Sequence, residues 1–144
     1  MDRDVLHASI LELIRKTSVS LPPDVAEVIS TRRVLESAGS RAELALSLVA
    51  SNIHLARTLS APICQDTGTI SFFVNAPKGF DSALFEKIAS AAVAEATQLG
   101  YLRQNSVDSV SGKNSGNNLG PGSPLFHFHQ EQFKIKSQKS KVKV

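Results

Sequence analysis

The chain contains a single cysteine, Cys64, so no internal disulfide can hold its fold together. Stability must then come from buried apolar side chains, and 42% of the 144 residues are hydrophobic. That content is enough for one ordinary core and predicts a single domain. No stretch approaches the roughly 20 apolar residues of a membrane-spanning helix, and the N-terminus lacks the apolar region of a secretory signal. We therefore expect a cytoplasmic protein without a membrane partner.

Charge is distributed unevenly along the chain. Residues 131–144 contain five lysines and one glutamate and carry +4, whereas the whole chain carries +3. The first 130 residues therefore carry −1, which argues against a basic body that binds nucleic acid. We accordingly divide the chain into a folded part, residues 1–130, and a basic C-terminal tail, residues 131–144.

Helical periodicity dominates the first half of the chain. Apolar residues recur every three or four positions and predict helices over about residues 3–17, 23–37 and 41–58. Pro22 and Pro23 separate the first two helices. Ser40 and Glu43 predict a capping box at the start of the third, in which each side chain accepts a hydrogen bond from the backbone N–H of the other. The apolar stripe of the third helix is expected to comprise Leu46, Val49, Ile53 and Ala56.

The second half of the chain adds strands, a helix and a polar loop. Residues 69–74 and 125–129 are short, aromatic or β-branched and predict strands, and residues 133–144 alternate like another strand. Asp81 is expected to cap a helix that ends near Gly100. This helix should turn Leu84, Ile88 and Ala92 inward. Residues 103–124 are rich in Asn, Ser and Gly, which indicates a flexible linker or a binding loop. The fold class is therefore α+β, with α-rich N-terminal helices followed by a short sheet.

Cys64 lies in residues 62–69, with the sequence Pro-Ile-Cys-Gln-Asp-Thr-Gly-Thr. An isolated cysteine is more often a small buried hydrophobe than a ligand. Gln65, Asp66 and Thr67, however, are hard to bury together in a core. This segment therefore indicates a chemical site. His127 and His129 share one face of a strand and could form a zinc site with Cys64 or Asp66, but we favour two ordinary edge histidines.

The segment resembles the cluster-ligating segment of the iron–sulfur hydro-lyases, the family of class I fumarate hydratase and the α subunit of L-tartrate dehydratase. Further blocks are similar and occur in the same order over about residues 1–130. They are Leu21-Pro22-Pro23, the helix over 42–57, Leu102-Arg103, residues 105–108, residues 112–122 and Phe126-His127-Phe128.

The resemblance implies specific roles for these residues. Cys64 would ligate a [4Fe–4S] cluster, and Asp66 would transfer a proton during catalysis. Gln65, Thr67 and Arg103 would bind a small dicarboxylate. Arg103 suits this role because a guanidinium matches a carboxylate with two parallel hydrogen bonds. The implied reaction is the reversible hydration of fumarate to malate or the dehydration of tartrate.

The chain also departs from the family pattern. The complete α unit is longer and supplies two more cysteines, a β unit supplies further groups, and Gln104 stands where the family usually has proline. We therefore expect a partial, truncated α domain that needs other α or β hydro-lyase chains for activity, as a homo-oligomer or a hetero-oligomer. The alternative is a catalytically inactive truncated paralogue that acts as an oligomerisation or interaction module.

Overall fold

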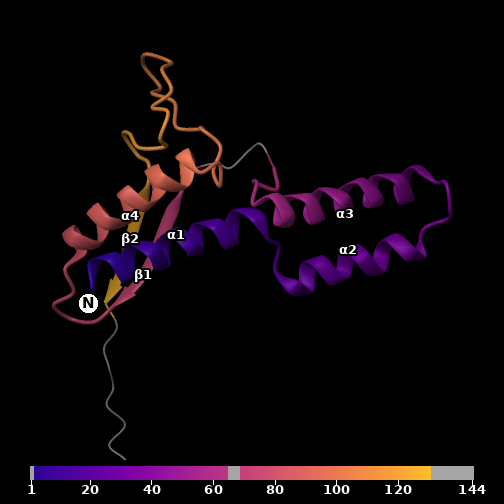
Figure 1. Cartoon of the computed structure of the whole chain (residues 1–144), viewed down its shortest axis with the longest axis horizontal. Coiled ribbons are helices and arrows are strands. Elements are labelled where there is room, and N and C mark those ends of the chain that lie inside the picture. Colours follow the sequence, from indigo (N-terminus) through magenta and orange to yellow (C-terminus); the bar gives the residue numbers. More distant parts are fainter. Residues whose placement is uncertain (1, 65–68, 131–144) are drawn as a thin grey trace, which may run out of the picture.

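The computed structural model of the protein describes residues 2–64 and 69–130 (Figure 1). The described elements are, in order, α1 (Arg3–Val19), α2 (Pro23–Leu35), α3 (Arg41–Leu59), β1 (Ser71–Ala76), α4 (Ser82–Gln98) and β2 (Leu125–Gln130). The α+β fold class is confirmed: four helices accompany a short sheet in this part of the chain. The strand expected over residues 133–144 lies outside the described residues.

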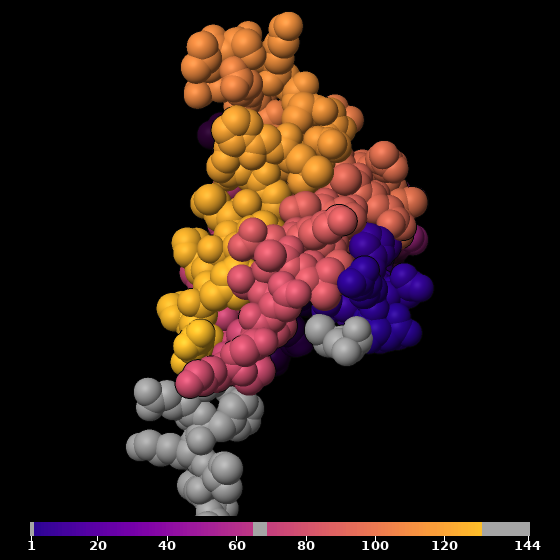
Figure 2. Space-filling view, turned by 90° about the vertical axis from the view of Figure 1, so that its left-hand side faces the viewer, coloured from indigo at the N-terminus to yellow at the C-terminus, as the bar shows by residue number. Residues whose placement is uncertain are grey.

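The sheet consists of β1 and β2, which are parallel. Its register pairs Ser71 with Leu125 and Ala76 with Gln130. Parallel neighbours need a crossover connection, and here it contains α4 and the loop of residues 99–124. That loop rises beyond the end of α4, as two perpendicular views show (Figures 1 and 2).

An aromatic cluster joins α4 to one face of the sheet. Phe72 and Phe126 stack across the two strands with ring centroids 5.2 Å apart. Phe85 of α4 meets Phe72, Phe126 and Phe128 edge-on at centroid distances of 6.3, 6.2 and 6.0 Å. Edge-to-face pairs at such distances are favourable because the ring edge is positive and the ring face negative. The opposite face of the sheet stays exposed, and Phe73 stacks there on His127.

The core lies between α1, α4 and the sheet. Ile10 and Ile14 of α1 are 5% exposed and pack against α4. On α4 the small side chains of Ala89, Ala92 and Ala96 are fully buried, which allows the two helices to approach closely. The inward face expected for this helix is confirmed: Ile88 and Ala92 are buried, and Leu84 is partly buried against the core.

The helices α2 and α3 form a hairpin that projects away from this core (Figure 1). In the described structure no residue of α2 is buried, and Ala56 is the one buried residue of α3. The apolar stripe predicted for α3 therefore stays largely uncovered: Ala56 is buried, whereas Val49 is 43% exposed. Periodicity places apolar residues on one face of a helix, but a partner element must cover that face to bury it.

Side-chain caps begin α3 and α4. Ser40 Oγ accepts a hydrogen bond from the Glu43 N–H at 3.0 Å, and Asp81 Oδ1 accepts one from the Leu84 N–H at 2.9 Å. The reciprocal half of the predicted capping box is wrong. The Ser40 N–H donates to the Ser37 carbonyl at 3.0 Å, since Gly39 adopts φ +77° and closes a turn there. Glu43 instead accepts from Ser47 Oγ at 2.8 Å.

Candidate functional site

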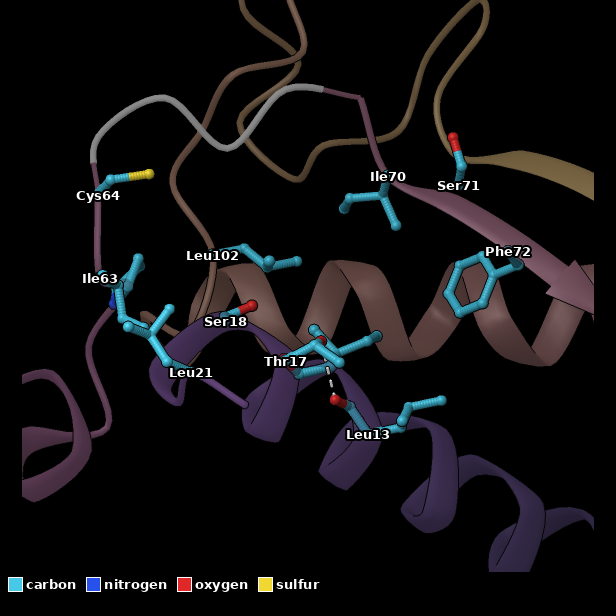
Figure 3. Close-up of a pocket in the computed structure, with 12 residues that line it drawn as sticks. Leu13, Thr17, Ser18, Leu21, Ile63, Cys64, Ile70, Ser71, Phe72 and Leu102 are labelled. Carbon is cyan, nitrogen blue, oxygen red and sulfur yellow. Dashed lines mark hydrogen bonds between the residues drawn. The ribbon is translucent and has the colours of Figure 1, made fainter. Parts of the chain in front are cut away.

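A cavity of about 500 Å³ lies beside Cys64 (Figure 3). Its walls come from parts of the chain that are distant in sequence. They are the C-terminal half of α1, Leu21 just after it, residues 62–64 at the start of the predicted cluster segment, residues 70–72 at the start of β1, and Leu102 after α4. Most of the lining is apolar, and Figure 3 shows the Sγ of Cys64 directed toward the hollow above Leu102.

Two helices fix the backbone just before Cys64. The N–H of Ile63 donates to the Ser18 carbonyl near the end of α1 at 3.1 Å. The side-chain amide of Asn52, on α3, donates to the Ile63 carbonyl at 2.7 Å. Ile63 is thus held on both sides, and the exposed Cys64 follows from a defined position.

The end of α3 directs the chain into this position. Ser60 takes the left-handed conformation at φ 49°, and the Ala61 N–H donates to the Ala56 carbonyl at 3.0 Å. This is a local way to satisfy the last carbonyls of a helix while reversing the chain. Arg15 of α1 contacts Ser60 Oγ at 3.4 Å, so the reversal also packs against α1.

The other predicted site residues are Arg103 and the three that follow Cys64. Gln65, Asp66 and Thr67 lie outside the described residues. Arg103 is exposed and directly follows Leu102, which is 8% exposed and forms part of the cavity wall. The structure therefore brings Cys64 and the residue before Arg103 to one cavity.

Residues 103–124 form a hydrogen-bonded loop rather than a plain linker. Val107 and Asn114 form an antiparallel bridge, and Asn114 Nδ2 donates to the Gln104 carbonyl at 2.6 Å. The Asp108 carboxylate accepts from the backbone N–H of Ser111 at 2.6 Å, from its hydroxyl at 2.7 Å, and from the Val110 N–H at 3.2 Å. These hydrogen bonds, led by the Ser111 N–H, hold the pKa of Asp108 below its usual value.

Two polar residues at the site were not identified from the sequence. Asn52 is an exposed helical residue with nothing in its local pattern to mark it. Asn118 is one of several asparagines in a polar loop, yet it is 4% exposed and forms four side-chain hydrogen bonds. Both act through contacts with residues more than ten positions away, which sequence patterns do not reveal.

The structure does not gather potential metal ligands among the residues that it describes. Over residues 2–64 and 69–130, no three His, Cys, Asp or Glu side chains are grouped so that they could hold a metal ion. A [4Fe–4S] cluster with one open iron requires three thiolates, and the chain has one cysteine. Its own residues therefore do not fit a complete cluster site.

Comparison with known proteins places these features in a family. The family model described as fumarate hydratase (Fumerase) matches residues 7–142. A protein of Geobacillus stearothermophilus that is named as a class I fumarate hydratase is 42% identical over 125 residues, which are 87% of this chain and 24% of the relative. The L(+)-tartrate dehydratase subunit alpha of Escherichia coli K12 is 33% identical over 108 residues, which are 74% of this chain and 35% of that subunit.

The chain thus spans well under half the length of the curated relatives that it matches. The family match includes the segment of Cys64, the loop of Arg103 and the helices that position them. In addition, no helix in the described part of the chain has the length and apolar character needed to cross a membrane. The predicted resemblance is confirmed, and the chain belongs to the fumarate hydratase (Fumerase) family.

Proposed function

We propose that this chain supplies part of the active site of an iron–sulfur hydro-lyase that hydrates fumarate to malate or dehydrates tartrate. The observation that carries the proposal is the cavity that joins Cys64 to Leu102, next to Arg103, in a member of this family. The names of its relatives support the same chemistry, since one is a fumarate hydratase and another a tartrate dehydratase subunit.

Each predicted residue has a role in this proposal. Arg103 binds a substrate carboxylate, because its planar guanidinium offers two parallel donors. Gln65 and Thr67 hydrogen-bond the same dicarboxylate, and Asp66 takes part in proton transfer at the substrate hydroxyl. Cys64 contributes one thiolate to a [4Fe–4S] cluster, and the remaining thiolates come from outside this chain.

Activity then depends on an assembly with other hydro-lyase chains. Two observations support this requirement: the sequence contains one cysteine, and one of the relatives is itself named a subunit. A reducing compartment such as the cytoplasm would keep the Cys64 thiol available as a ligand. We expect the chain by itself to show no hydro-lyase activity.

Complementation tests the proposal. The full chain is co-produced anaerobically with a form of the Geobacillus relative that lacks the 125-residue matched region, and fumarate hydration and L-tartrate dehydration are measured. The matched region of the relative, supplied as a separate chain, is the positive control. Restored activity that Cys64→Ala abolishes and Ser71→Ala preserves supports the proposal, because Ser71 also lines the cavity but is not a proposed ligand. If only the positive control restores activity, the proposal is wrong.

A second candidate function is an interaction module without catalytic activity. The observation in its favour is the α2–α3 hairpin, where Val28, Val34 and Leu35 are 58%, 72% and 69% exposed. Such apolar surface on a projecting hairpin is typical of a protein contact. Sedimentation of the purified chain decides this point: a concentration-dependent dimer that Val28→Asp with Leu35→Asp converts to a monomer supports it, and a folded monomer at all concentrations contradicts it.

A further inference from the structure

The loop that carries Arg103 is organised around one buried side chain, that of Asn118. This residue is 4% exposed and takes the left-handed backbone conformation at φ 59°. Few residues other than glycine adopt that region, but asparagine is several-fold enriched in it. A buried amide is costly unless its hydrogen-bonding atoms are paired, so the contacts of Asn118 indicate what it stabilises.

Three of the four contacts of the Asn118 side chain are with the segment after α4, and the fourth is with α4 itself. Its Oδ1 accepts from the N–H groups of Asn105 and Ser106 at 2.8 and 3.1 Å. Its Nδ2 donates to the Arg103 carbonyl at 2.6 Å and to Thr97 Oγ1 at 3.0 Å. An amide side chain offers two donors and two acceptor positions, so its capacity is fully used.

These contacts attach the segment to rigid parts of the fold. Thr97 is in α4, 6% exposed, and its hydroxyl donates to the Val93 carbonyl at 2.8 Å. Leu102, just before Arg103, is anchored in the hydrophobic core. The backbone of Arg103 is therefore fixed on one side by a core side chain and on the other by the Asn118 amide.

We propose that Asn118 is a positioning residue: it sets the backbone from which the Arg103 guanidinium reaches a substrate carboxylate. This inference rests on the proposed function, since it assigns Arg103 the role of binding a dicarboxylate. A flexible side chain such as arginine binds more tightly when its point of attachment is held in place, because less conformational entropy is lost on binding.

The matched substitutions are Asn118→Asp and Asn117→Asp. Asn118→Asp keeps the size and the acceptor but replaces the donor to the Arg103 carbonyl with an oxygen. Asn117 is the adjacent residue, and its Oδ1 only accepts, from the Leu119 N–H at 3.0 Å, so the aspartate variant preserves that contact. A general effect of added charge or of a perturbed loop would appear in both variants.

The first measurement is a double-mutant cycle in the complemented hydro-lyase, with succinate as a non-reacting dicarboxylate. We expect Asn118→Asp to weaken succinate binding about tenfold, the scale expected when a buried polar group loses its partner. In the Arg103→Ala background the same change should have no effect, because the two residues act through one contact. An equal loss in both backgrounds, or no loss in either, overturns the inference.

The second measurement uses the full chain alone and does not depend on the proposed function. Amide NMR spectra should show that Asn118→Asp shifts the signals of Gln104, Asn105 and Ser106, whereas Asn117→Asp leaves them in place. Unchanged signals overturn the inference even if the hydro-lyase is active. Shifted signals with an assembly that has no activity would instead count against the proposed function.

Discussion

Asn52 and Ile63 are joined by a hydrogen bond of 2.7 Å between the Asn52 side-chain amide and the Ile63 carbonyl, eleven residues further along the chain. The same residue Ile63 donates its N–H to the Ser18 carbonyl. One residue before Cys64, the chain is therefore tied to both α3 and α1. The position of the candidate ligand depends on how these two helices meet.

Asn52→Ala removes the first of these ties. We expect a loss of about 1 kcal/mol in the free energy of unfolding, the usual net value of one hydrogen bond. Amide exchange at Ile63 and Cys64 should accelerate more than exchange in α4. Ser51→Ala, at the adjacent exposed helical position, is the control and should change neither quantity. Equal exchange at Cys64 in the Asn52 variant and the parent would contradict this role.

The two ends of the expected capping box have unequal effects. Ser40→Ala should destabilise the protein by about 1 kcal/mol, because the Glu43 N–H loses its acceptor. Glu43→Ala should cost less, about 0.5 kcal/mol, since its carboxylate does not bond the Ser40 N–H and mainly the favourable negative charge at the helix N-terminus is lost. Urea unfolding of both variants measures the difference. Equal losses would show that the reciprocal contact forms in solution.

Burial against α4 distinguishes two positions on α1. Ile10 is 5% exposed in the core, whereas Val5 is 60% exposed. Ile10→Ala should lower the free energy of unfolding by about 2–5 kcal/mol, through lost transfer energy and the cavity left behind. Val5→Ala should change it by less than about 0.5 kcal/mol. Comparable values for the two variants would mean that α1 does not pack on α4 as described.

Asp108 should make the stability of its loop depend on pH. Hydrogen bonds from Ser111 lower its folded pKa below the ordinary value of 3.8, so the folded state binds fewer protons than the unfolded state. The stabilisation is complete when the pH is above the ordinary pKa of 3.8, and it is lost as the pH falls through the lowered pKa of the folded state. The difference in stability between the parent and Asp108→Asn should therefore shrink in acid. A difference that stays constant across this range would argue against the contacts.

Local chemistry made several elements predictable from the sequence. Ser40 and Asp81 were expected as caps because short polar side chains bond N–H groups only a few residues away. The inward face of α4 followed from helical periodicity at Leu84, Ile88 and Ala92. The resemblance of the segments around Cys64 and Arg103 to one family also proved correct.

Other features depend on contacts between distant residues, so the sequence could not supply them. The stripe on α3 has the right spacing, but Val49 remains 43% exposed because the core is formed by other elements. The reciprocal bond to the Ser40 N–H was lost to the turn at Gly39. Asn118 could be recognised only once its partners at Thr97 and Arg103 were brought to it by folding. The roles of Gln65, Asp66 and Thr67 stay predictions.

The most direct test of the central claim, that Cys64 is an iron ligand of a shared hydro-lyase site, is the iron and sulfide content of the complemented assembly after anaerobic reconstitution. We expect about four irons per assembly, as in a [4Fe–4S] cluster. The Cys64→Ser assembly should lose both the iron and the fumarate hydration activity. Ser71→Ala should retain both. An assembly that holds the same iron and the same activity with Cys64→Ser would contradict the claim.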